Sequence, residues 1–89
     1  MEQLFSELDS WRSNENKIFK TFKFESFEKS IAFANSVANL SEKENHHPEI
    51  YINFKKVKLT YTSHDLNCLS VKDFICAAKV DFKIYKSLV

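Results

Sequence analysis

Apolar and polar residues alternate in several short stretches of the chain, and a period of two is the pattern of a β-strand. The first long stretch covers residues 18–24, where Ile18, Phe22 and Phe24 share one face. Lys20 interrupts that face, so we expect its ammonium group to snorkel to solvent or to lie at a sheet edge. A shorter strand is expected to begin at Trp11, with a turn at residues 13–16 before the longer one.

Two further alternating stretches, residues 50–54 and 57–61, are close neighbours in the sequence. Lys55-Lys56 lies between them, which predicts a β-hairpin. A tight type I′ turn needs positive φ at two positions, a geometry that lysine disfavours. We therefore expect a looser or bulged connection.

Three other stretches carry apolar residues at helical spacing. A short first helix is expected to end near Asp9-Ser10, and a second, N-capped by Ser26, to run to about Lys43. Ser70 and Asp73 fit a capping box at the start of a third. The apolar stripes expected to face the core are Leu4, Phe5 and Leu8 in the first helix, Phe27, Ile31, Ala34, Val37 and Ala38 in the second, and Val71, Phe74, Ile75, Ala78, Phe82 and Tyr85 in the third.

The expected order of elements is therefore α-β-β-α-β-β-α. Interleaved helices and strands with short hairpin links predict an α+β fold, with a four-stranded antiparallel sheet and the helices packed on one face. A chain of 89 residues suits one domain with a thin core, so residues 1–89 are treated as a single domain. The other sheet face or an exposed edge strand would then be free for self-association.

Composition excludes several classes of function. The net charge is +1 and the lysines are spread among acids, so the sequence has no one-sided basic footprint and no direct nucleic-acid binding is expected. No stretch approaches the roughly 18 apolar residues of a membrane span. An acidic start without an apolar core, and only two cysteines, favour a reduced, cytoplasmic protein. Without a single glycine, the chain has no phosphate-binding loop.

The candidate chemistry lies in three histidines. His46 and His47 are adjacent and precede Pro48, and His64 follows the second hairpin strand. An unperturbed pKa of about 6.5 lets histidine exchange protons near neutral pH. With Cys68 these histidines are acceptable zinc ligands, but the spacing fits no standard finger and adjacent side chains on a strand diverge. We therefore expect acid–base chemistry and no metal.

The residues around the histidines resemble the pterin-4a-carbinolamine dehydratase family. The family pattern is an acid, three residues, His-His-Pro, an aromatic six residues on, a second histidine ten further and an aspartate in the last helix. It is filled in order by Glu42, His46, His47, Pro48, Phe54, His64 and Asp73. The resemblance covers nearly the whole chain. One departure is Ile50, where many members carry an aromatic residue, and it removes a possible wall of the pocket.

The resemblance implies a reaction and roles. The family removes water from 4a-hydroxytetrahydrobiopterin, a pterin-4a-carbinolamine, to give the quinonoid dihydropterin of tetrahydrobiopterin recycling, without a metal or redox cofactor. Because the C4a hydroxyl leaves well only when protonated, and N5 must lose a proton, one acid and one base are needed. His47 is implied as the principal acid–base residue, His46 as its assistant and His64 as the third member.

Other residues are expected to complete the pocket. Glu42 either orients an imidazole or is an exposed helix charge, and Asp73 is expected to serve mainly the capping box. Trp11 and Tyr51 have rings that would flank a flat heterocycle, although such rings in a small domain more often belong to the core. The substrate-binding candidates from the His-His-Pro segment and the loop after the second hairpin strand are Pro48, Ser63, Asp65 and Leu66.

Two alternatives of other kinds stay open. Some animal members of the family act as dimerization cofactors for a homeodomain transcription factor, so the chain can be a non-catalytic interaction module. It can also use a different pterin, as in molybdenum-cofactor or folate metabolism. A homodimer or a homotetramer is expected, and the pattern does not choose between them.

Overall fold

The computed structural model describes residues 11–62 and 69–86, and the predicted first helix lies outside them. The described elements alternate in the predicted order. They are β1 (Arg12–Asn14), β2 (Lys17–Lys23), α2 (Phe27–Glu44), β3 (Glu49–Asn53), β4 (Lys56–Tyr61) and α3 (Val71–Lys79), which continues as the π-helical segment η1 (Val80–Tyr85). No helix in this part of the chain is long and apolar enough to cross a bilayer.

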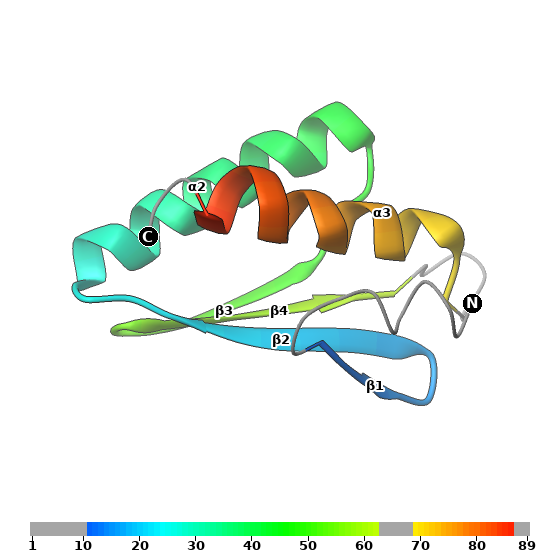
Figure 1. Cartoon of the computed structure of the whole chain (residues 1–89), viewed down its shortest axis with the longest axis horizontal. Helices are drawn as coiled ribbons and strands as arrows, with labels where there is room; N and C mark the ends of the chain where they lie inside the picture. The colour runs from blue at the N-terminus through cyan, green and yellow to red at the C-terminus, as the bar shows by residue number, and fades with distance from the viewer. Residues whose placement is uncertain (1–10, 63–68, 87–89) are drawn as a thin grey trace.

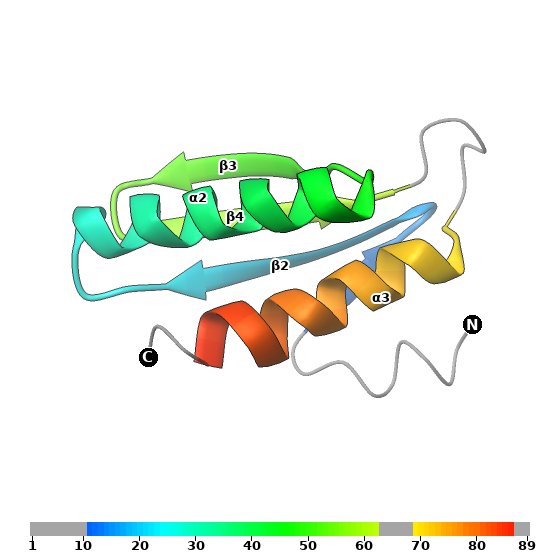
Figure 2. The same ribbon diagram turned by 90° about the horizontal axis from the view of Figure 1, so that it is seen from above.

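The four strands form one antiparallel sheet in the order β1-β2-β4-β3. Both helices cover the same face of this sheet, with α2 above β3 and β4 and α3 above β2 (Figures 1 and 2). The predicted α+β fold is therefore confirmed. The opposite face carries no helix of the described chain and is called the open face below, while β3 is an edge strand.

The core lies between the sheet and the helices. Strand alternation sends every second side chain of β2 and β4 toward the helices, as the sequence predicts. The core residues are Trp11, Ile18, Phe22, Phe24, Val57, Leu59 and Tyr61 from the sheet side, and Phe33, Val37, Phe74, Cys76, Ala77 and Val80 from the helices.

The buried face of α2 differs from the predicted stripe. Ser30 and Ser41 are buried in place of Phe27, which is 49% exposed. Each serine hydroxyl donates to the carbonyl one turn earlier, Ser30 to Ser26 at 3.3 Å and Ser41 to Val37 at 2.7 Å. Because this bond satisfies the hydroxyl within the helix, serine can be buried beside apolar side chains. The predicted stripe was wrong at Phe27 and Ala38, which are exposed, and it omitted Phe33, which is fully buried.

The last helix shows the same difference. Val71, Ile75 and Phe82 were predicted to face the core but are exposed, whereas Asp73 and Asp81 are buried. A carboxylate can be buried only where partners satisfy it, and both aspartates find theirs far away in the sequence.

Lys20 is the clearest correction. It lies on β2, between β1 and β4, and therefore not at an edge. Its Nζ reaches Asp81 Oδ1 at 2.9 Å and sits 4.8 Å from the ring centroid of Phe22. Trp11 Nε1 donates to the other Asp81 oxygen at 2.8 Å. Lys20 thus neither snorkels to solvent nor lies at an edge, because its ammonium group forms an ion pair with the buried Asp81 carboxylate.

The β3–β4 connection is also tighter than predicted. Asn53 pairs with Lys56, which leaves Phe54 and Lys55 as a two-residue loop. Only Phe54 takes a positive φ, of 54°. A left-handed conformation at a single non-glycine residue costs roughly 1–2 kcal/mol. The turn requires it at Phe54 and at neither lysine, so the cost that was expected to prevent a tight turn arises once.

Candidate functional site

The two adjacent histidines lie in the short link between α2 and β3. Asn45 ends α2 in the left-handed region, with φ of 52°, and its N–H donates to the Ser41 carbonyl. Asparagine tolerates this conformation better than most residues and commonly ends helices. The following extended link sends the two imidazoles in different directions, His46 toward α3 and His47 back toward α2.

The His46 imidazole has one partner at its ring edge and another against its ring face. Its Nε2 lies 2.5 Å from Asp73 Oδ1, and its side chain is only 14% exposed. Its ring stacks on Tyr61, with centroids 5.9 Å apart and planes within 6° of each other. A carboxylate at one nitrogen fixes both the tautomer and the orientation of an imidazole. His46 is therefore presented in one fixed pose.

Asp73 serves two groups at once. Its Oδ2 accepts from the Ser70 backbone N–H at 2.9 Å, so the predicted capping box is present. Its Oδ1 makes the contact with His46, and the side chain is fully buried. The sequence favoured the cap as the main role and did not identify His46 as the partner, which is 27 residues away.

His47 occupies a very different environment. Its Nε2 lies 2.6 Å from Glu42 Oε2, and both side chains are largely exposed, at 56% and 78%. Exposed pairs of this kind are worth at most about 1 kcal/mol. Glu42 therefore orients His47 without burying it, and leaves the ring open to a solute.

The layer beneath His46 contains two groups that stay neutral. Burial raises the pKa of the Tyr61 hydroxyl well above its ordinary value, and the neighbouring Cys76 and Asp73 side chains add to this. Burial also raises the pKa of the Cys76 thiol to about 11, with Glu44 adding to the effect. Both groups are thus protonated at neutral pH. The acidic side chain in contact with His46 is that of Asp73.

Possible metal ligands do not gather in the described residues. Across residues 11–62 and 69–86, no three side chains of His, Cys, Asp or Glu are grouped so that they could hold an ion. His64 and Cys68, which belong to the alternative zinc reading, lie outside these residues.

With this geometry established, comparison with known proteins identifies the family. Residues 1–83 match the sequence profile of the pterin 4 alpha carbinolamine dehydratase family. The chain belongs to this family. The resemblance that the histidine pattern indicated is therefore confirmed.

Bacterial relatives of this dehydratase family match most of the chain. A protein of Nitrosospira multiformis is 43% identical over 79 residues, which cover 89% of this chain and 70% of the relative. One from Vibrio cholerae is 42% identical over 84 residues, which cover 90% and 77%. Both are provisionally named pterin-4-alpha-carbinolamine dehydratases.

Solved structures of the family show the same fold. A transcriptional coactivator/pterin dehydratase from Brucella melitensis superposes with a TM-score of 0.88 at 28% identity, over 94% of this chain and 92% of the other. A pterin dehydratase-like protein identified as a RuBisCO assembly factor in the alpha-carboxysome has a TM-score of 0.70 at 32% identity, over 82% and 87%. Members of this fold thus carry names of both enzymes and protein-assembly factors.

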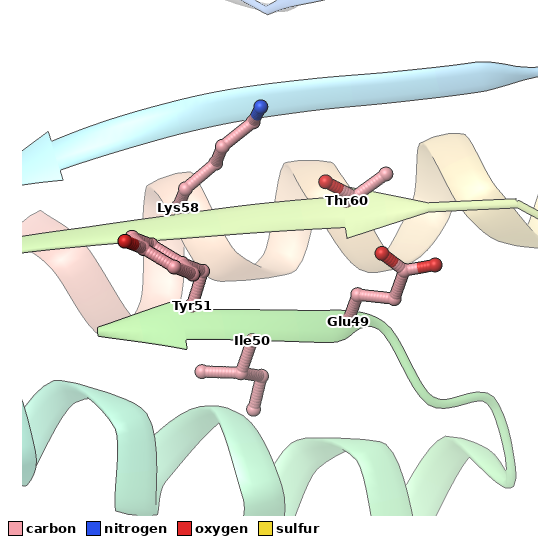
Figure 3. A pocket seen from close by; sticks show the side chains of 5 residues that line it. All are labelled: Glu49, Ile50, Tyr51, Lys58 and Thr60. Carbon is pink, nitrogen blue, oxygen red and sulfur yellow. The ribbon is translucent and has the colours of Figure 1, made fainter. Parts of the chain in front are cut away.

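The structure brings together some of the predicted pocket residues of the dehydratase pattern and separates others. Glu42 and Asp73 each contact one histidine, and Pro48 is half-buried in the same link. Tyr51, 64% exposed, points from β3 to the open face, opposite the side where His46 lies (Figure 3). Trp11 is in the core. Ser63, His64, Asp65 and Leu66 lie outside the described residues, so their roles stay predictions.

Tyr61 is the residue of this site that sequence reasoning missed. The alternation of residues 57–61 predicts that Tyr61 faces inward with Val57 and Leu59, and all three are buried. The pattern does not show that the ring continues to the His46 imidazole. Its contact depends on where the link after α2 crosses the end of β4, which is a property of the tertiary fold.

Proposed function

We propose that this protein is a dehydratase that removes water from 4a-hydroxytetrahydrobiopterin, giving the quinonoid dihydropterin for tetrahydrobiopterin recycling in the cytoplasm. The observation that supports it is a pair of adjacent histidines, each in contact with its own carboxylate, in a chain of the dehydratase family. The reaction needs one proton delivered and one removed. Two imidazoles with different surroundings suit these two tasks.

The proposed step breaks the C4a–O bond. A protonated imidazole donates to the C4a hydroxyl, which leaves as water with the bonding electrons. The N5 lone pair forms the C4a=N5 double bond, and the N5 proton passes to a base. His47 suits the principal role because its ring is exposed to a solute while Glu42 orients it. His46 suits an assisting role, because Asp73 and Tyr61 fix its position.

The roles proposed for the remaining residues of the pocket rest on the family resemblance. His64 is proposed as the third member of the cluster, with Ser63, Asp65 and Leu66 bordering the pterin. Neither proton transfer requires a metal or redox cofactor. Trp11 packs in the core and Tyr51 points to the open face, so the structure lends no support to their role as pterin flanks.

A stopped-flow assay of 4a-hydroxytetrahydropterin dehydration tests the function. We expect the purified protein to accelerate the reaction well above the rate in buffer. No acceleration by a folded protein, with pterins of different side chains, would contradict the enzyme and favour the interaction-module alternative. Acceleration confined to another pterin would instead point to molybdenum-cofactor or folate metabolism.

We also propose that the protein is a homo-oligomer, joined through the edge strand β3 and the neighbouring start of α2. Ile50, Ile52, Phe54 and Phe27 are 38%, 38%, 62% and 49% exposed. The strand end and the helix start are adjacent, because the Phe24 N–H donates to the Lys55 carbonyl at 2.8 Å. An unpaired edge beside exposed apolar side chains favours association with a second copy.

Light scattering after gel filtration checks this association. We expect the wild type to show a dimer or tetramer mass and Ile52→Arg to shift it toward the monomer. Ile75→Arg, the same substitution at a similarly exposed position on α3, is the matched control. A monomeric wild type, or dissociation by the control alone, would contradict an interface at β3.

A further inference from the structure

Cationic side chains that are far apart in the sequence lie together on the open face of the sheet. Strand alternation and register place five cations there. They are Arg12, Lys17, Lys23, Lys56 and Lys58. Glu49 is the one acid that the described strands add to this face. The sequence showed no one-sided basic cluster, because these residues are spread over 47 positions of a chain whose net charge is +1.

Three lysines away from the open face have carboxylate partners. Lys20, Lys29 and Lys79 each pair with a carboxylate, at 2.9, 3.3 and 2.7 Å. Within the described part of the chain, none of the five open-face cations has such an ion pair. Lys58 contacts an aromatic face, with its Nζ 4.9 Å from the Phe19 ring centroid.

Two of the five stand directly opposite each other. Lys23 pairs with Lys56 across β2 and β4. Like charges at facing positions destabilise a sheet. Lys58 follows Lys56 on the same face, about 6.6 Å further along the strand. The arrangement opposes folding in the free protein, and an anionic partner would relieve the repulsion.

The same face contains a hollow between β3 and β4. It has a volume of about 380 Å³ and is lined by Glu49, Ile50, Tyr51, Lys58 and Thr60. Figure 3 shows Lys58 and Thr60 beside Tyr51 and Glu49, with Ile50 turned toward α2. The hollow therefore combines a cation, a hydroxyl and an exposed aromatic ring with one carboxylate, Glu49, on the opposite side of the sheet from His46.

We propose that the open face binds an acidic, extended segment of a partner protein. Acidic side chains at every second position of an extended segment repeat at about 6.6–6.8 Å, which matches the spacing of Lys56 and Lys58. Tyr51 and Thr60 offer an aromatic surface and a hydrogen-bonding group alongside. Binding of this kind is governed by electrostatic complementarity, so it is weak, fast and sensitive to salt.

Single-stranded nucleic acid fits the face less well. Proteins that bind single strands stack successive bases on several aromatic rings. Of the two open-face rings, Phe19 is occupied by the Lys58 ammonium group. Only Tyr51 is left for stacking among the described open-face residues. The cations, in contrast, can pair with the carboxylates of an acidic peptide as well as with phosphates.

Fluorescence anisotropy with a labelled peptide tests the proposal on the full chain. The probe alternates glutamate and threonine over about twelve residues, which is about 40 Å when extended and longer than β4. We expect it to bind the wild type, and to bind more weakly as salt rises from about 50 to 500 mM. The face variant Lys23→Glu/Lys56→Glu/Lys58→Glu is expected to bind about tenfold more weakly or worse, since three attractive contacts become repulsive.

The matched control is Lys43→Glu/Lys72→Glu/Lys86→Glu, which changes the net charge equally at exposed helix positions. It is expected to bind as the wild type does. Equal weakening in both variants, or no binding by the wild type, would overturn the proposal, as would tighter binding of an oligothymidylate of equal charge. If the face variant does not fold, the same comparison is made with glutamine at the three positions.

Discussion

His47→Ala is expected to lose most dehydratase turnover, by about 10²–10⁴-fold, while the protein stays folded. The loss follows from removing the principal acid–base group of the proposed step. The fold should survive because the His47 side chain is 56% exposed and its one described partner, Glu42, is 78% exposed. Stopped-flow turnover beside the thermal unfolding curve of the same sample measures both parts.

The matched control for this prediction is Lys43→Ala, an exposed position next to Glu42 in the last turn of α2. It should leave both turnover and melting temperature near the wild type. Turnover at the wild-type rate in a folded His47→Ala protein would refute the assigned mechanism. A loss of turnover that only followed a lower melting temperature would show that His47 matters for structure instead.

The strands and their order could be predicted from the sequence because their signal is local. Alternation in residues 18–24 and 57–61 assigns the inward faces of β2 and β4, and Ile18, Phe22, Val57 and Leu59 are buried as expected. Ser26 marked a helix start as an N-cap residue, and Ser70 marked another through its capping box with Asp73. Such patterns need no knowledge of distant contacts.

The helix faces could not be predicted in the same way. Ser30, Ser41, Asp73 and Asp81 are buried because hydrogen bonds or ion pairs satisfy them, and hydrophobicity does not show this. Asp81 takes its partners from residues 70 and 61 positions away. A hydrophobic stripe therefore rotates away from the true core wherever a polar side chain finds a distant partner.

In the candidate site, too, the sequence predicts which residues take part, and the tertiary fold decides how they pair. The family pattern named Glu42, His46, His47 and Asp73, but not which carboxylate meets which histidine. The structure pairs the buried acid with the buried imidazole and the exposed acid with the exposed one. This matching separates two adjacent residues of the same type into a rigid member and an accessible member. The chain achieves it by ending α2 at Asn45.

Asp73→Ala is expected to weaken the protein and its turnover together. The cap at the start of α3 contributes about 0.5–2 kcal/mol. The buried contact with His46 adds about 1–3 kcal/mol, because its loss leaves the imidazole without the carboxylate that accepts from it. The free energy of unfolding should therefore fall by about 1.5–5 kcal/mol. We expect turnover of the folded fraction to fall about 10- to 100-fold, since His46 is no longer held in place.

Ser70→Ala separates the two contributions of Asp73. It removes the capping hydroxyl and leaves the contact between His46 Nε2 and Asp73 Oδ1 intact. We expect a loss of about 0.5–2 kcal/mol and nearly unchanged turnover. If Asp73→Ala were no more destabilising than Ser70→Ala and equally active, the carboxylate would serve only the helix cap. If Asp73→Ala alone loses turnover after correction for the folded fraction, the buried carboxylate acts through the position of His46.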